Sequence, residues 1–198
     1  MKKKILLIFG TRPEAIKMAP IYLELSKNTD QFHPMICVTG QHREMLDQVL
    51  EIFNIKPDID LNIMKNGQDL FDITSSVILE MRQVLIDSSP DLVMVHGDTS
   101  TSMASAIAAF YSNIKIWHVE AGLRTNNIMS PFPEEFNRQL VSKISNIHLA
   151  PTKSAKSNLI LEGVNADKIF VTGNTVIDSL HITLDNLKGD LNKTSELT

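Results

Sequence analysis

Three acidic side chains stand where apolar runs end, at positions that a folded chain would normally fill with neutral residues. Asp98 follows "LVMVHG", Glu120 follows "KIWHV", and Glu134 follows "SPFP". An acid at the end of a buried strand costs on the order of several kcal/mol unless it is paired or protonated. Carboxylates that lie close together raise one another's pKa, so one can hold a proton while another accepts one. If the strands of Asp98 and Glu120 are neighbours, this pattern predicts an acid–base site.

A cationic pair lies near the N-terminus, in "FGTRPEAIK". Thr11 and Glu14 have the spacing of a helix capping box, and capping alone accounts for these two residues. Arg12 is different, because a guanidinium beside a helix N-terminus is well placed to bind a phosphate oxygen. Lys17 lies about one turn further along the same helix. The sequence therefore predicts an anion site, although the G-x-G-x-x-G fingerprint of dinucleotide-binding folds is absent.

Simpler explanations compete with the chemical one for several of these residues. Asp98 or Thr99 could serve as the N-cap of the helix that follows. Histidines within strands, here His96 and His118, are more often satisfied core groups than functional ones. Glu135 suits the positive end of a helix that begins near Pro133.

The elements that must position these residues alternate along the chain. Apolar runs without polar alternation, typical of parallel strands covered on both faces, occur at Ile5–Phe9, Met35–Thr39, Leu92–His96, Ile114–Val119, Ile147–Ala150 and Ile169–Thr172, with a weaker run at Ile59–Asn62. Helical spacing of apolar residues marks 43–53 and 70–81. The pattern predicts an α/β domain, a Rossmann-like open parallel sheet with helices on both faces. Ligands of such sheets bind beyond the carboxyl ends of the strands, where the acids stand. We place this domain at residues 1–180 and interpret the polar segment 181–198 as a linker.

Composition narrows the class of protein. The 198-residue chain has a net charge of −4, which argues against nucleic-acid binding. The single cysteine, Cys37, lies in an apolar run, is expected in the core, and fits a reducing compartment. No apolar run approaches the ~20 residues of a membrane span. These features predict a cytoplasmic protein that binds neither nucleic acid nor membrane.

Six motifs together resemble the non-hydrolysing UDP-N-acetylglucosamine 2-epimerases. They are "FGTRPEAIKMAP", "TGQHREMLDQVL", "VHGDTSTS", "HVEAGLRT", "SPFPEEFNRQ" and "TGNTVIDSL". The resemblance implies the N-terminal domain of a glycosyltransferase-B-like fold, in which two Rossmann-like domains enclose the active site. It also implies interconversion of UDP-N-acetylglucosamine (UDP-GlcNAc) and UDP-N-acetylmannosamine (UDP-ManNAc), through elimination of UDP to a 2-acetamidoglucal and re-addition. It implies neither metal nor cofactor, and a homodimer formed through this domain, for which helices 43–53 and 70–81 offer apolar residues.

The resemblance also implies roles for individual residues. Asp98, Glu120 and Glu134 match the acid–base carboxylates around the sugar. Four residues match substrate-binding positions, the first two near the UDP phosphates: Arg12, Lys17, His118 and Arg124. Gln41 and His42 match a region where bacterial members bind a second UDP-GlcNAc as activator. Glu44 and Gly67 stand where some members carry glutamine and arginine.

Three other functions are compatible with these residues. A glycosyltransferase of the same architecture would need an acceptor site and gives no role to three acids. A nucleotide-sugar binding module without chemistry would not need them either. A hydrolysing relative, which releases free N-acetylmannosamine, is the closest competitor.

Overall fold

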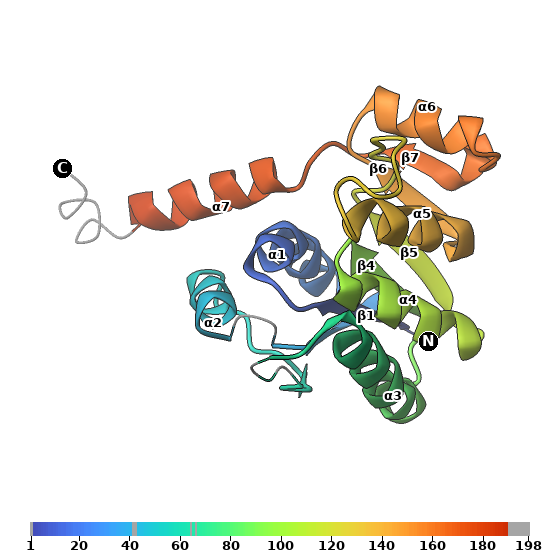
Figure 1. The fold of residues 1–198 in the computed structure, drawn as a ribbon. Coiled ribbons are helices and arrows are strands. Elements are labelled where there is room, and N and C mark those ends of the chain that lie inside the picture. Colours follow the sequence, from blue (N-terminus) through green and yellow to red (C-terminus); the bar gives the residue numbers. More distant parts are fainter. Residues whose placement is uncertain (1, 41–42, 64, 66, 190–198) are drawn as a thin grey trace.

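The chain folds around a parallel sheet of seven strands in the order β3-β2-β1-β4-β5-β6-β7 (Figure 1). The structure is a computed structural model that describes residues 2–40, 43–63, 65 and 67–189. The strands are β1 Lys3–Phe9, β2 Phe32–Val38, β3 Ile59–Asp60, β4 Leu92–His96, β5 Lys115–Val119, β6 Ile147–Ala150 and β7 Ile169–Val171. All seven predicted strands are confirmed, and β4 pairs with β5 as the acid–base site requires.

Helices cover both faces of the sheet, as predicted (Figure 1). One face packs against α1 Arg12–Lys27, α2 Arg43–Ile52 and α7 Val176–Gly189. The other packs against α3 Leu70–Ser88, α4 Ser100–Tyr111, α5 Glu134–Ile144 and α6 Lys153–Leu161, and a short 3-10 turn, η1 Ala166–Lys168, precedes β7. Successive strand residues point to opposite faces, which divides the core into two main layers. Cys37 is buried in the α3–α4 layer, as expected, and burial raises the pKa of its thiol to about 12. Among the described residues, no helix has both the length and the apolar character needed to cross a membrane.

Two helices extend beyond the segments predicted for them. Helix α3 continues past Met81 to Ser88, because Val84 and Leu85 carry the buried stripe onward. Helix α7 continues to Gly189 through a stretch predicted as linker. Its Ile182 packs against the α1–α2 layer, so this part of the helix is held by the domain. The predicted boundary at residue 180 thus falls inside a helix, and the division into domains stays a prediction.

A buried glutamate joins the starts of α1 and α4. Thr11 and Glu14 form the predicted capping box, in which Glu14 Oε2 accepts from the backbone nitrogens of Gly10 and Thr11 at 3.0 and 2.8 Å. No role beyond capping was predicted for Glu14. In the structure its side chain is buried, and Oε1 accepts from the hydroxyl of Thr99, the N-cap of α4, at 2.6 Å. Ser102 in the first turn of α4 lies 2.9 Å from the same oxygen. The two helix starts that flank the predicted site are therefore fixed to each other.

We expect Gly122→Ala to lower the free energy of unfolding by at least about 3 kcal/mol. Gly122 has φ of 92°, and an added Cβ would lie 2.3 Å from the carbonyl oxygen of Ala155, a backbone atom that cannot easily move. Gly163→Ala is the matched control, because Gly163 has φ of 87° but open space around it. It should cost roughly 1 kcal/mol, from backbone strain alone. Urea unfolding of both variants measures the difference, and equal losses would contradict the close contact at Gly122.

Candidate active site

A cavity of about 550 Å³ lies beyond the carboxyl ends of β4 and β5. Its size is within the range of about 300–1,000 Å³ that is usual for small-molecule sites. The three predicted acids, Asp98, Glu120 and Glu134, all line it, so the convergence expected from strand order is observed. The other lining residues come from the starts of α1, α3, α4 and α5 and from the end of β4: Thr11, Pro13, Glu14, Lys17, Leu70, His96, Thr99, Ser100, Pro133 and Asn137.

Glu120 is held in an unusual backbone conformation directly after β5. Its φ is 59°, in the left-handed region that costs a non-glycine residue on the order of 1 kcal/mol. The turn brings its carboxylate to the α1 side of the sheet. There Oε2 accepts a hydrogen bond from Lys17 Nζ at 2.6 Å, and Oε1 lies 3.8 Å from His96 Nε2. The predicted anion-binding lysine is thus an ion-pair partner of one of the acids.

Asp98 is bound by α5 through two consecutive residues. Arg138 forms an ion pair with its carboxylate, and the Asn137 side chain donates to its backbone oxygen at 2.8 Å. Burial raises the pKa of Asp98, and the nearby carboxylates of Glu134 and Glu120 raise it further, against the opposing charge of Arg138. Sequence reasoning missed Asn137 and Arg138. The available signal was their spacing of three and four residues from Glu134, which places all three on one face of a helix.

The two adjacent glutamates at the start of α5 have different surroundings. Glu134 is half-buried and faces the cavity, and within the described residues no side-chain hydrogen bond or ion pair reaches its carboxylate. Glu135, which sequence reasoning treated as an ordinary helix-end acid, is fully buried. Burial alone would raise the pKa of Glu135, but hydrogen bonds from Gln139 and Thr125 and the charge of Arg138 hold it below its usual value. Glu135 therefore anchors the preceding loop, while Glu134 is free to face a ligand.

The structure places three other predicted site residues outside the cavity lining. Arg12 is exposed at the first position of α1. His118 is fully buried with Nε2 2.7 Å from the Gly97 carbonyl oxygen, and burial lowers the pKa of His118 to about 3. The Arg124 side chain is 1% exposed and forms a two-pronged ion pair with Glu162. Their contacts with substrate stay predictions. The predicted activator residues Gln41 and His42 lie outside the described part of the chain.

Comparisons with known proteins give one consistent family. The family model described as UDP-N-acetylglucosamine 2-epimerase matches residues 24–198. A UDP-N-acetylglucosamine 2-epimerase of Campylobacter jejuni is 56% identical over 190 residues, which are 96% of this chain and 49% of the relative. The chain thus spans about half the length of the curated relatives it matches.

Solved structures agree with that result. A crystal structure of UDP-GlcNAc 2-epimerase from Neisseria meningitidis bound to UDP-GlcNAc has a TM-score of 0.93 and 53% identity, covering 98% of this chain and 52% of that one. A lipopolysaccharide outer core galactosyltransferase shares the fold alone, with a TM-score of 0.63, 16% identity, and coverage of 86% of this chain and 45% of that one. The second likeness supports the expected glycosyltransferase-B-like architecture.

The contribution of the Arg124–Glu162 ion pair to the free energy of unfolding should depend on pH. Hydrogen bonds from Arg124 hold the pKa of Glu162 below its usual value. A lowered pKa in the folded state contributes stability above the ordinary value of about 4.3, and this contribution is lost as pH falls through the lowered pKa. We expect Glu162→Gln to cost about 2 kcal/mol at pH 7, since it leaves a buried guanidinium without its ion-pair partner, and progressively less below about pH 4.

The matched control for this prediction is Glu24→Gln. Glu24 pairs with Lys27 on the exposed surface of α1, and such pairs contribute about 0–1 kcal/mol. Unfolding in urea at a series of pH values measures both variants. A loss for Glu162→Gln that stayed constant with pH would show that the pair contributes through packing rather than through charge.

Proposed function

The chain belongs to the UDP-N-acetylglucosamine 2-epimerase family, and we propose that it supplies the acid–base groups of an enzyme that inverts C2 of UDP-GlcNAc. The product of that inversion is UDP-ManNAc. The observation that carries the proposal is the meeting of Asp98, Glu120 and Glu134 in one cavity, each with different partners. A binding module would have no need for three acids at considerable desolvation cost.

The reaction needs a base and a leaving group that act together. Removal of UDP to a 2-acetamidoglucal breaks the C2–H bond and the C1–O bond. The proton goes to a carboxylate, and the C1–O electron pair leaves with the diphosphate. Re-addition of UDP at C1 and of a proton at C2 completes the cycle. Inversion requires that the proton leaves from one face of the sugar and returns to the other. Acids that follow β4 and β5 and an acid that begins α5 line one cavity, and the proposal requires that two of them lie on opposite faces of the bound sugar.

The surroundings of the acids suggest a division of roles. The raised pKa of Asp98 suits it to hold and donate a proton. Glu120, paired with Lys17, is suited to accept one. Arg12, Lys17 and the N-termini of α1 and α4 would bind the diphosphate, because helix N-termini present backbone donors and a positive field to anions.

Several finer features form part of the same proposal. The relatives are about twice as long, so a second domain would supply the opposite wall of the cleft and most uridine contacts. The Neisseria relative, bound to UDP-GlcNAc, supports the choice of substrate. We propose that the enzyme is non-hydrolysing. We also propose that Arg124 and His118 act in the site indirectly, through the residues they hold. Finally, we propose that the protein works in the cytoplasm, where nucleotide sugars are made.

We expect Asp98→Asn, Glu120→Gln and Glu134→Gln each to lower kcat by at least about 100-fold in the full-length enzyme, the usual scale for an acid–base group. The measurement is proton NMR of UDP-GlcNAc in deuterium oxide, which follows both epimerisation and deuterium incorporation at C2. Asp167→Asn, an exposed carboxylate in η1, is the control and should leave turnover unchanged. Near-normal turnover in any of the three variants would remove that residue from the catalytic set. Absence of C2 exchange in the wild type would refute the proposed function.

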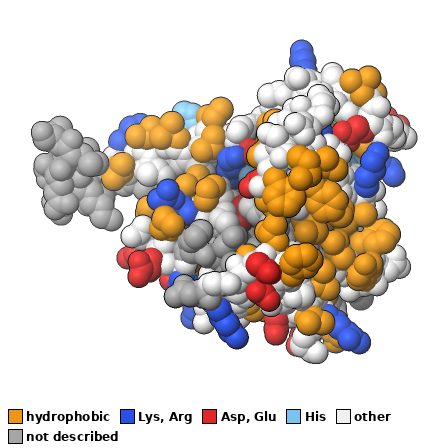
Figure 2. All heavy atoms as spheres, in the orientation of Figure 1, with side chains coloured by type: hydrophobic (Ala, Val, Ile, Leu, Met, Phe, Trp, Pro, Cys, Tyr) orange, Lys and Arg blue, Asp and Glu red, His pale blue; other side chains and the backbone are white. Residues whose placement is uncertain are grey.

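We propose further that the protein is a homodimer, formed through the outer face of α3, α4 and α5. Sequence reasoning named α2 and α3, but α2 buries Leu46, Val49 and Leu50 on its own domain. Figure 2 shows hydrophobic side chains gathered over α3, α4 and α5. There Phe71 of α3 is 84% exposed and lines a groove of about 590 Å³ between α3 and α5. Apolar patches of this kind mark interaction sites more often than free surface.

Phe71→Lys should therefore convert the protein to monomer, because a dimer contact would bury an unpaired ammonium. Sedimentation velocity at tens of micromolar measures the change. Leu161→Lys is the matched control, since Leu161 on α6 is 85% exposed but lies away from this face. Wild-type protein that sediments as a monomer would contradict the proposed dimer, and loss of the dimer in the control would contradict its location.

A further inference from the structure

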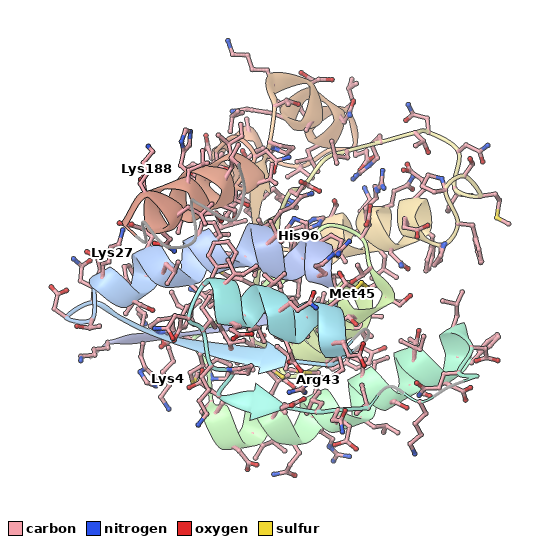
Figure 3. All side chains as sticks on the ribbon, turned by 90° about the vertical axis from the view of Figure 1, so that its left-hand side faces the viewer. Lys4, Lys27, Arg43, Met45, His96 and Lys188 are labelled. Carbon is pink, nitrogen blue, oxygen red and sulfur yellow. The ribbon has the colours of Figure 1, made fainter. Side chains whose placement is uncertain are left out.

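His96, the last residue of β4, has a buried ring nitrogen that faces an acid of the site. Its side chain is 6% exposed, and within the described residues no hydrogen bond reaches Nε2. The Oε1 atom of Glu120 lies 3.8 Å from that nitrogen. Figure 3 shows His96 beside the N-terminal part of α1, the helix that carries Lys17. A buried polar nitrogen without a partner is rare in folded proteins and calls for an explanation.

The imidazole of His96 is neutral at ordinary pH. Burial and, to a smaller extent, the nearby ammonium of Lys17 lower the pKa of His96 to about 3. The groups that face it are Lys17 from α1, Glu120 after β5 and His118 from β5. Since Glu120 is ion-paired with Lys17, its carboxylate can only accept hydrogen bonds. The ring nitrogen next to it must therefore carry the proton and act as a donor.

We propose that His96 is a positioning residue for Glu120: its Nε2–H holds Oε1 of the carboxylate from beneath the cavity while the other oxygen faces Lys17. The inference rests on the proposed function, in which Glu120 moves a proton. Catalytic hydrogen bonds are commonly long without substrate and tighten when it binds. A shift of about 1 Å would bring the 3.8 Å contact to hydrogen-bond length.

The arrangement solves a problem that the Lys17 contact creates. The proposed function gives Lys17 a second task, binding the diphosphate, and an ammonium drawn toward phosphate holds Glu120 less firmly. A neutral donor whose side chain is only 6% exposed keeps the carboxylate in place during that exchange. Because it adds no positive charge, it lowers the basicity of the proton acceptor less than a second cation would.

The other two buried histidines show that this contact is specific to His96. His118 Nε2 lies at the Gly97 carbonyl, so that nitrogen is satisfied by the backbone. His148 on β6 is buried and also has an unpartnered nitrogen, Nδ1, but no described acid forms an ion pair with it. His148 therefore provides a control with the same burial and the same kind of unpaired nitrogen, away from the cavity.

The test compares three variants of the full-length enzyme. His96→Leu removes the donor at similar volume, His96→Gln restores an N–H near the position of Nε2, and His148→Leu reports the cost of losing a buried histidine. We expect His96→Leu to lower kcat by roughly 10- to 100-fold, the scale for a hydrogen bond to a charged group. KM should stay within about threefold, because a residue that acts through Glu120 contributes little to substrate binding. The acidic limb of the kcat/KM profile should move to higher pH, since the carboxylate form of Glu120 loses a donor.

His96→Gln should recover most of the lost activity, and His148→Leu should keep both the kcat and the pH profile of the wild type. A merely structural role for His96 would instead give parallel losses in His96→Leu and His148→Leu, no recovery in His96→Gln, and an unmoved pH profile. That result would overturn the inference while leaving the proposed function intact.

A second measurement does not depend on turnover. In protein labelled with ¹⁵N-histidine, NMR should show His96 as the neutral Nε2–H tautomer from pH 5 to 9, with an Nε2 resonance that shifts in Glu120→Gln. An unprotonated Nε2, or no shift in that variant, would overturn the contact. If the wild type shows no exchange at C2, the proposed function fails and the inference fails with it, whatever the NMR result.

Discussion

The geometry of the candidate site depends on one buried carboxylate, that of Glu14. Its two oxygens collect donors from Gly10 and Thr11 at the start of α1 and from Thr99 at the start of α4. Removing a charge from water costs free energy unless hydrogen bonds of this kind compensate for it. Because each of these hydrogen bonds is needed, the two helix starts that provide the donors are held rigidly. The consequence is that two helix N-termini, which would otherwise be joined only through the sheet, face the cavity at a fixed separation. Lys17 is placed by the first of these helices, and the loop of Asp98 by the second.

The three acids of the candidate site differ in their charged neighbours and in their backbone conformation. Asp98 is half-buried and has a guanidinium partner, Glu120 has an ammonium partner and a strained backbone, and Glu134 has no charged partner among the described residues. Three identical settings would give three groups that titrate together. Different settings allow one carboxyl group to hold a proton while its neighbour accepts one, the requirement for moving a proton between two faces of a sugar.

Much of this architecture could be predicted from the sequence, and the failures have physical causes. Apolar runs identified all seven strands, because fully covered parallel strands leave no polar alternation to confuse the pattern. The acids were found because a charge at the end of such a run is costly. Arg124 could not be judged in the same way: its partner Glu162 is 38 residues away, and no local pattern connects them. The long-range contacts of Glu14 and Glu135 were not predicted. Each residue already has a local explanation, as a capping-box residue or as an acid at the positive end of a helix.

The single turn of α5 from Glu134 to Arg138 carries groups of several kinds. Glu134 faces the cavity, Glu135 anchors the preceding loop, and Asn137 and Arg138 bind Asp98. Each successive residue of a helix is rotated by about 100° around the axis. Inserting or deleting one residue here would therefore rotate the groups that follow the change by about 100° relative to those that precede it. Side chains on the outward side of α5 can be replaced without this effect, whereas the number of residues in this turn cannot change, so the register of the helix is itself a part of the candidate site.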